Sequence, residues 1–342
     1  MLGLVTPPPA VAESGRADGE RAGGKTSAAA RLARVASVFS KKLATSLLVV
    51  LALASTVFFS LRLLPGDPAA LVLGELSGPD ERAVLRAKLS LDRPLVVQYA
   101  LFLKRLVTLD LGDSLRRPGT TVLSRLGASL VPTAQLAFLA VALGAVAGTG
   151  LAVLASGPWL GKKRVVVERF LDVCAATPLL AFAPLVTFVL AAKLRVMPLP
   201  GDPDAGIAGL VFASSMLAVP LFAHVGRITR AALRDHERAP FLTVARAKGA
   251  SFFRVWVLHA LPASVGPIAT VVGTQLGALL GGAVVLERLF ERPGLGSLIL
   301  EAYASRDLPV LEAAIVLTGA LFVLAQSAAQ AVHGAVDPRV AK

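Results

Sequence analysis

The sequence predicts an all-α polytopic membrane protein with six transmembrane helices. Of its 342 residues, 55% are hydrophobic and 17% are charged, whereas charged residues make up about a quarter of an ordinary soluble domain. Six stretches of 19 to 24 residues carry no charge beyond a single Arg, and each can cross about 30 Å of hydrocarbon as a helix. The six stretches are 43–64, 131–154, 173–192, 207–225, 265–286 and 313–332.

The basic residues predict which side of the membrane each loop occupies. Segments 25–42, 162–164 and 227–262 carry net charges of +5, +3 and +5, and counting spans places all three on the side of the N terminus. Short loops rich in Lys and Arg stay in the cytoplasm. We therefore expect both termini in the cytoplasm, because six spans return the chain to its starting side. Since the excess of cations follows this topology, nucleic acid is a poor alternative partner.

Residues 1–40 are expected to form a disordered cytoplasmic tail. Within it, residues 19–26 read GERAGGKT and match the spelling of a phosphate-binding loop. Such a loop follows a buried strand and opens a helix. The preceding residues, VTPPPAVAESGRAD, are too poor in apolar side chains to form that strand. The match is therefore interpreted as part of the tail, and no ATP site is expected here.

Residues 41–128 are expected to hold the first span and an external insertion after it. Pro79 suits the first position of a helix over PDERAVLRAKLS, and a second helix is expected over VVQYALFLKRL. Arg62, near the outer end of the first span, is expected to extend its guanidinium toward the interface. The rest of the chain is expected to comprise five spans within 129–334, external connections at 193–206 and 287–309, and a cytoplasmic C terminus at 335–342.

The internal segment 227–262 differs from the other connections, because it is polar yet keeps helical spacing. It is interpreted as two short amphipathic helices joined at Gly249. The apolar positions are Phe241, Val244 and Ala245 in the first helix, and Phe252, Phe253, Trp256 and Val257 in the second. Such helices can lie on a lipid surface or dock into the groove of a partner, and their amphipathicity alone does not separate the two.

The fifth span carries a stripe of glycines. Gly273, Gly277 and Gly281 share one helical face, which lets another backbone approach closely. The stripe suits either sliding between conformations or fixed packing within the chain.

Residues that would support chemistry are few. The chain has four His and one Cys, and these are too scattered to supply a nucleophile with its base or a set of metal ligands. Cys174 is expected to pack in the third span. No span centre carries an acidic residue, which disfavours a proton-coupled carrier. We therefore expect neither an enzyme nor a bound cofactor or metal ion.

The stretch TVARAKGASFFRVWVLHALP resembles the EAA loop of ABC importer permeases. In that pattern EAA is followed by three residues, Gly, nine residues, Ile, any residue, Leu and Pro. The matching residues are Ala245, Gly249, Leu261 and Pro262, and the departures are Thr243, Val244 and His259. ARAKG and the later HAL are similar to the dipeptide, oligopeptide and nickel subfamily.

Further segments of the family occur in order along the chain. They are LRLLPGDPA, LDRPLVVQYALFL, LDLGDSL, RPGLGSLILEAYASRDLPV and DPRV. The likeness covers residues 45–340. Gln326 and Gln330 stand where relatives are expected to have Asn and Asp, so no role is transferred to these two positions.

This resemblance implies the type I ABC importer permease fold, with a cytoplasmic two-helix coupling loop between the fourth and fifth spans. It implies a permease that forms half of the channel for peptides or a similar small solute in a bacterial or archaeal inner membrane. The implied partners are a second homologous permease, two cytoplasmic ATPases that use ATP and Mg, an extracytoplasmic substrate-binding protein and membrane lipid. The alternatives are a single-chain secondary carrier and a membrane scaffold with an unassigned partner.

The resemblance also assigns roles to particular residues. The implied ATPase-coupling residues are Phe241, Thr243, Val244, Ala245, Arg246, Lys248, Gly249, Phe252, His259, Leu261 and Pro262. In this family the fifth span borders the translocation path near the partner permease, which would place the glycine stripe there.

Overall fold

The structure, a computed structural model, describes residues 44–63, 68–74, 78–281 and 283–336. Helices dominate this part of the chain, and the isolated β-bridge within it joins Asp113 to Thr121. The chain divides into two compact units, Met1–Thr45 and Ser46–Lys342, and the contacts described below lie within the second. The expected tail, its GERAGGKT stretch and residues 337–342 lie outside the described residues.

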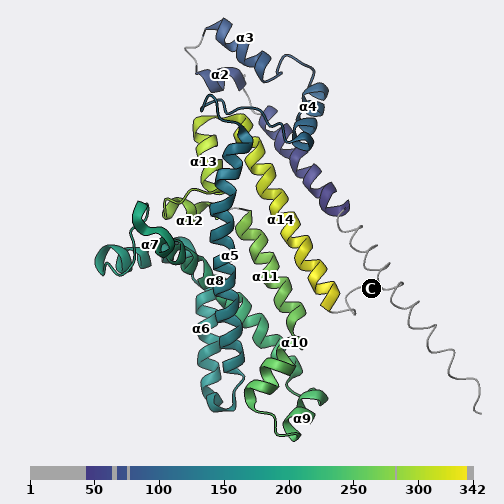
Figure 1. The fold of residues 1–342 in the computed structure, drawn as a ribbon, viewed down its shortest axis with the longest axis vertical. Coiled ribbons are helices and arrows are strands. Elements are labelled where there is room, and N and C mark those ends of the chain that lie inside the picture. The colour runs from purple at the N-terminus through teal and green to yellow at the C-terminus, as the bar shows by residue number, and fades with distance from the viewer. Residues whose placement is uncertain (1–43, 64–67, 75–77, 282, 337–342) are drawn as a thin grey trace, which may run out of the picture. The chain divides into compact units, whose positions relative to one another are not determined.

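Four helices of the described chain are long and apolar enough to cross a membrane (Figure 1). They are Ala44–Arg62, α5 (Val122–Ala155), α8 (Gly206–His236) with the short turn before it, and α14 (Leu308–Val336). Two pairs of shorter helices pass the same test together but are sharply bent. Six spans result if each bent pair counts as one, which is the number that the sequence predicts.

The third predicted span, residues 173–192, is not one continuous helix. α6 (Arg164–Ala176) ends within it, and α7 (Leu179–Thr187) with the π-helical turn η2 (Phe188–Lys193) continues in another direction. The two arms meet at 95°. The cause is local, because Thr177 precedes a proline and leaves the helical region, with φ −68° and ψ 118°.

The fifth predicted span, residues 265–286, is shorter than expected. α11 (Val265–Leu280) ends at a cap formed by Gly281, and a separate helix, α12 (Val284–Leu289), follows. A glycine costs a helix interior about 1 kcal/mol relative to alanine, which favours an end at this point. At its other end α11 meets the preceding helix at 67°.

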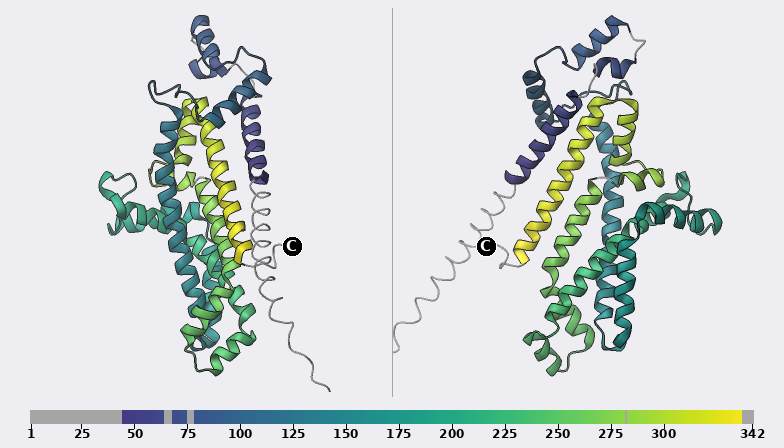
Figure 2. Two further views of the ribbon diagram at one scale, coloured as in Figure 1. Left: turned by 45° about the vertical axis from the view of Figure 1, so that its right-hand side comes forward. Right: turned by 180° about the vertical axis from the view of Figure 1, so that it is seen from behind.

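Glycines let α5 and α8 pack closely. A β-carbon at Gly148 would stand 2.5 Å from the backbone oxygen of Phe222. A β-carbon at Gly144 would stand 3.1 Å from the backbone nitrogen of Phe222. Small residues are common where membrane helices approach each other in this way. The pairing of α5 with α8 and that of α11 with α14 are the most extensive between helices, and Figure 2 shows α11 beside α14 from two sides.

The predicted glycine stripe lies against α14. A β-carbon at Gly273 would collide with Ala329, and one at Gly277 would stand 3.2 Å from the backbone oxygen of Phe322. Gly281 completes the stripe at the C-terminal cap of α11. The stripe therefore packs within the chain, and its use for sliding or for fixed packing stays a prediction.

Several short helices lie at one end of the second unit. α2 (Pro68–Leu73), α3 (Pro79–Lys88), α4 (Leu95–Thr108) and α13 (Leu295–Ser305) are found there. α9 (Pro240–Ala247) lies at the opposite end (Figure 1), and we call these the α13 end and the α9 end. α3 opens on Pro79 and α4 covers the second helix expected in the insertion, so both predictions are confirmed.

Arg62, which was expected to extend toward the interface, pairs with other side chains. Its guanidinium lies 2.6 Å from Glu312 of α14, and the two side chains are 18% and 15% exposed. It also donates to Gln98 of α4 at 3.1 Å and lies 3.6 Å from the ring centroid of Phe58. This partly buried pair joins the first span, α4 and α14.

Candidate functional site

The segment singled out by its amphipathic spacing contains α9, the π-helical turn η4 (Arg254–Ala260) and α10 (Leu261–Ala263). We call residues 239–263 the α9–α10 segment. It follows α8 and leads into α11, so it connects two membrane helices. The prediction of two short helices joined at a glycine is confirmed.

Gly249 makes the turn between these helices by adopting a left-handed backbone, with φ of 77°. Its N–H donates to the carbonyl of Arg246 at 2.9 Å, and the N–H of Ala250 donates to the carbonyl of Ala245 at 3.1 Å. These two bonds form a Schellman motif, which ends a helix at a residue with positive φ. Nothing lies within 4 Å of the position that a β-carbon would take, so the requirement for glycine comes from the backbone alone.

One face of the segment packs against the chain's own long helices. Leu242 is fully buried and Trp256 is 4% exposed. They belong to a cluster made of Val153, Leu233, Leu242, Val255, Trp256 and Ala260. Its first two members come from α5 and α8. Because burying a large apolar side chain contributes about 1.5–3 kcal/mol, the cluster fixes the segment to both helices.

The other face of the segment is open. The exposed members of the predicted coupling set are Phe241, Thr243, Val244, Arg246, Lys248, Gly249, His259 and Pro262, and the half-buried ones are Ala245, Phe252 and Leu261. The predicted apolar faces of the two short helices were therefore assigned wrongly in part. Trp256 lies inside the molecule, whereas Phe241, Val244 and Phe253 remain exposed.

Trp159 extends this surface and was not among the residues predicted from the sequence. The 3-10 turn η1 (Pro158–Lys163), between α5 and α6, carries Trp159. The Trp159 ring centroid lies 4.4 Å from that of Phe252, edge to face, and 6.4 Å from that of Phe253. Trp159 is 54% exposed. Nothing in the sequence signals this contact, because the partners lie on different connections.

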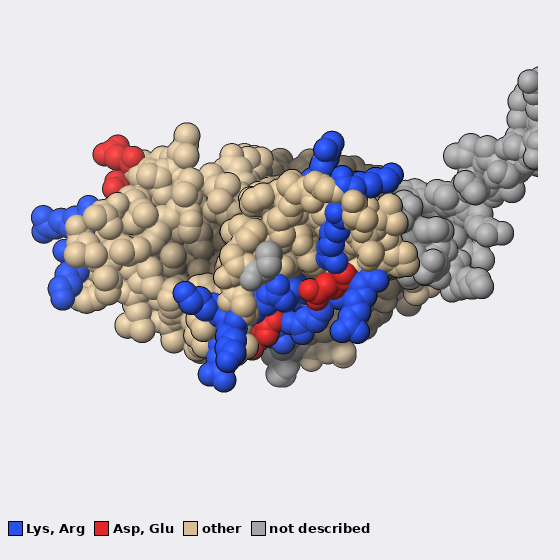
Figure 3. Space-filling model, turned by 90° about the horizontal axis from the view of Figure 1, so that it is seen from below, with Lys and Arg blue, Asp and Glu red and all other residues tan. Residues whose placement is uncertain are grey.

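Cations are concentrated on this surface. The α9–α10 segment and η1 together contain Arg246, Lys248, Arg254, Lys162 and Lys163, and neither contains Asp or Glu. All five cations are exposed. Figure 3 looks onto this end of the molecule and shows Lys and Arg side chains spread over it. The surface therefore combines exposed aromatic rings with positive charge.

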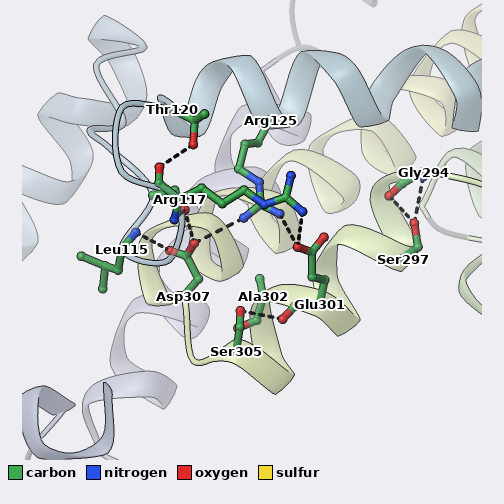
Figure 4. A network of polar contacts seen from close by, with 11 residues as sticks. Leu115, Arg117, Thr120, Arg125, Gly294, Ser297, Glu301, Ala302, Ser305 and Asp307 are labelled. Carbon is green, nitrogen blue, oxygen red and sulfur yellow. Dashed lines mark hydrogen bonds and ion pairs between the residues drawn. The ribbon is translucent and has the colours of Figure 1, made fainter. Parts of the chain in front are cut away.

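A separate network of polar residues lies at the α13 end (Figure 4). Asp307 is 0% exposed and accepts hydrogen bonds from Ser114 Oγ, from Leu115 N at 3.1 Å and from Arg125 at 3.3 Å. Arg125, on α5, also lies 2.9 Å from Glu301 of α13. The network joins the family-like stretches LDLGDSL and ASRDLP, whose contacting residues are 192 positions apart.

Glu287 is a further buried carboxylate, 1% exposed. It accepts hydrogen bonds from Thr133 Oγ1 at 2.6 Å and from Ser297 N at 2.8 Å. The second bond places it at the N terminus of α13, where the helix dipole stabilises a negative charge. This geometry joins α5 to α12 and α13. Among the described residues, no three His, Cys, Asp or Glu side chains are grouped so that they could hold a metal ion.

Two family models match this sequence. The model described as a binding-protein-dependent transport system inner membrane component matches residues 140–342. The model for the N-terminal part of such membrane components matches residues 36–137. The first match covers more than half of the chain and contains the whole α9–α10 segment.

Individual relatives and solved structures agree with these models. The "Probable peptide ABC transporter permease protein y4tP" of Sinorhizobium fredii is 30% identical over 306 residues, which cover 88% of this chain and 97% of the relative. The dipeptide transport system permease protein DppB of Bacillus subtilis is 27% identical over 299 residues, which cover 85% and 93%. An inward-facing conformation of the MetNI methionine ABC transporter has a TM-score of 0.51 at 20% identity and covers 62% of this chain and 96% of that one, which supports the fold.

Proposed function

This chain belongs to the family of binding-protein-dependent transport system inner membrane components, and from that premise we propose that it forms one half of the translocation channel of a peptide importer. It is a multi-pass permease of the inner membrane, and permeases of this kind carry no ATPase of their own. Separate ATPase and binding-protein subunits therefore complete the transporter. In the proposed complex these are two cytoplasmic ATPases, which bind ATP and Mg, an external binding protein and a second permease of the same family.

The proposed cargo is a short peptide. Support comes from relatives whose descriptions name peptide and dipeptide transport. The test is uptake of labelled dipeptides, tripeptides and nickel by the assembled complex with its binding protein. We expect peptide uptake that depends on ATP, and uptake of nickel alone would contradict the assignment.

In this proposal the α9 end faces the cytoplasm, as its concentration of Lys and Arg supports. Lys163→Cys and Pro240→Cys should then react with an impermeant thiol reagent only after the inner membrane is opened. Val84→Cys and Pro203→Cys should react in spheroplasts without that step. Labelling of position 240 from outside would contradict the orientation.

The α9–α10 segment is the proposed contact with an ATPase. The observation that carries this proposal is its two-faced structure, in which Leu242 and Trp256 are buried against α5 and α8 while Phe241 and Val244 remain open. A segment fixed in this way passes a displacement on to the membrane helices instead of absorbing it. The open face supplies the apolar area that docking into a cleft requires.

Substitution of Gly249 tests the coupling role. Gly249→Val places a β-branched residue at φ of 77°, a backbone conformation that such residues strongly resist. Gly249→Asn is the matched control, because Asn tolerates this conformation. We expect the Val variant to insert but to lose transport and the stimulation of ATP hydrolysis by loaded binding protein, while the Asn variant keeps most of both. Normal transport by the Val variant would contradict the coupling role.

Purification separates this proposal from a single-chain carrier or a scaffold. An importer permease should be isolated together with ATPase subunits and a second permease, and it should transport only in that assembly. Transport by the isolated chain in vesicles without ATP would favour the carrier instead.

A further inference from the structure

The turn η1 lies on the connection that the sequence predicts between the second and third spans, residues 155–172. α6 and α8 are joined by Asp172 and Arg227, which lie 3.3 Å apart and are both more than half exposed. Exposed charges of this kind do not face the centre of a bilayer. From Asp172 back to Arg164, α6 extends by a further eight residues, roughly 12 Å at 1.5 Å per residue. If this ion pair marks the edge of the hydrocarbon, those roughly 12 Å exceed the headgroup layer, which is about 5–8 Å thick on each side.

η1 and the α9–α10 segment present one continuous aromatic surface. Trp159 contacts Phe252 and Phe253, and Phe253 is 56% exposed. The ring of Trp159 also covers Gly157, where a β-carbon would collide with it. Arg254 follows Phe253 in the sequence, and Lys162 and Lys163 lie in the same turn as Trp159. An aromatic centre with a charged rim is the composition of a protein-binding hot spot.

We propose that η1 is a second part of the ATPase docking surface, with Trp159 as its anchor and Lys162 and Lys163 facing acidic residues of the ATPase. This inference rests on the proposed function, which assigns only the α9–α10 segment to that contact. The charge of the two elements carries it, because their five cations have no acidic residue within either element and an acidic partner surface would complement them.

A contact at η1 changes which membrane helices the ATPase drives. η1 follows α5 directly, and the α9–α10 segment follows α8. Since α5 and α8 form the most extensive helix pair of the chain, an ATPase that holds both connections moves the pair as a unit. A lipid surface is the other class of partner for Trp and Lys, and the predicted position of η1 outside the spans disfavours it.

Cross-linking in the assembled complex tests the contact, in a Cys174→Ala background. We expect Lys162→Cys and Lys248→Cys, each labelled through a maleimide with a short photoreactive group, to form a cross-link to the ATPase. Val166→Cys, on the exposed face of α6, is the control and should form none. A cross-link from position 248 without one from position 162 would overturn this inference and leave the proposed function standing. If neither position forms a cross-link, the result would contradict both this inference and the proposed coupling role of the α9–α10 segment.

Two further measurements separate an ATPase contact from lipid binding and from simple packing. Lys162→Glu should retain the ATPase roughly fivefold less well at low salt, with the difference lost at high salt. Arg169→Glu, an equal charge change at another exposed position, should have no such effect. A photoreactive amino acid at position 159 should label the ATPase, and labelling of phospholipid instead would refute the proposal.

Discussion

The two ends of the second unit place their charged residues in opposite ways. At the α13 end the charges lie inside, where Asp307 and Arg125 are 0% and 8% exposed at the side chain and bind each other. In the α9–α10 segment, at the other end, apolar residues such as Leu242 are buried, whereas the charged side chains, among them Lys248 and Arg254, are exposed. A buried charge needs a fixed partner within the fold, whereas an exposed one remains available to another molecule.

This contrast supports the proposal that the α13 end is a permanent joint and the α9 end a docking surface. The buried carboxylates Asp307 and Glu287 each bind α5, which is distant in sequence, through Arg125 and Thr133, and their charges are matched by donors inside the chain. The five cations of the α9–α10 segment and η1 have no Asp or Glu within those two elements. Substitutions at the α13 end should therefore change the stability of the permease, whereas substitutions of the exposed cations should change its assembly.

The largest expected effect is that of Asp307→Ala. It leaves Arg125 buried without its carboxylate partner and removes the acceptor of Ser114 and Leu115. Breaking a buried ion pair in this way costs about 3–5 kcal/mol of unfolding free energy. Denaturation of the purified permease in detergent micelles should show this loss.

Glu301→Ala is the matched control for that experiment. Glu301 also contacts Arg125 at 2.9 Å, but its side chain is 44% exposed. Exposed ion pairs are worth about 0–1 kcal/mol. Equal losses of unfolding free energy from Asp307→Ala and Glu301→Ala would contradict the distinction between a buried joint and surface charge.

Leu242→Ala tests whether the α9 end is held by apolar packing. Leu242 is fully buried in the cluster with Val153 and Trp256, and truncating such a residue costs about 2–5 kcal/mol. We expect a destabilised α9–α10 segment, which proteolysis or hydrogen exchange at residues 239–263 would detect. Phe241→Ala, at an exposed neighbour, should leave exchange nearly unchanged, and the reverse order would contradict the assigned faces.

A smaller effect is expected where α11 packs against α14. Gly273→Ala forces a β-carbon into contact with Ala329, and overpacking of this kind costs about 1–3 kcal/mol. Gly150→Ala, within α5, meets nothing within 4 Å and should stabilise the helix by about 0.5–1 kcal/mol. Denaturation in micelles should therefore give shifts of opposite sign, and shifts of the same sign would contradict the packing of the stripe.

The smallest effect on stability is expected from Lys248→Ala and Arg254→Ala. Both side chains are exposed, and surface substitutions of this kind usually change the unfolding free energy by about 0.5 kcal/mol or less. Retention of the ATPase should nevertheless fall, most clearly at low salt. A loss of stability as large as that of Asp307→Ala, with unchanged ATPase retention, would reverse the comparison between the two ends.

Features that depend on neighbouring residues were accessible from the sequence. Pro79 begins α3 because its fixed φ suits the first helical position, and Gly249 takes the left-handed conformation that ends α9. The break at Thr177 was also local, since the residue before a proline avoids the helical region. It was missed because the apolar run through 173–192 was interpreted from its length and not from its backbone preferences.

Contacts between distant segments could not be found in this way. The sequence showed LDLGDSL and ASRDLP as separate motifs but not that Asp307 receives the hydrogen bond of Leu115. Amphipathic spacing likewise gave Trp256 and Phe253 the same role, although one is buried and the other is exposed. Which face of a short helix is buried depends on where α5 and α8 bring their own apolar residues, and periodicity carries no information about that position.

By itself the sequence determined that this chain is a helical membrane protein of the permease family with an amphipathic helix pair after the fourth span. Hydropathy, charge and the glycine turn are properties of short stretches, so they can be recognised without knowledge of the fold. Only the tertiary structure decided that the glycine stripe faces α14, that Arg62 pairs with Glu312, and that Trp159 meets Phe252. Each of these contacts joins helices that lie far apart in the chain, and their meeting is set by how whole helices pack.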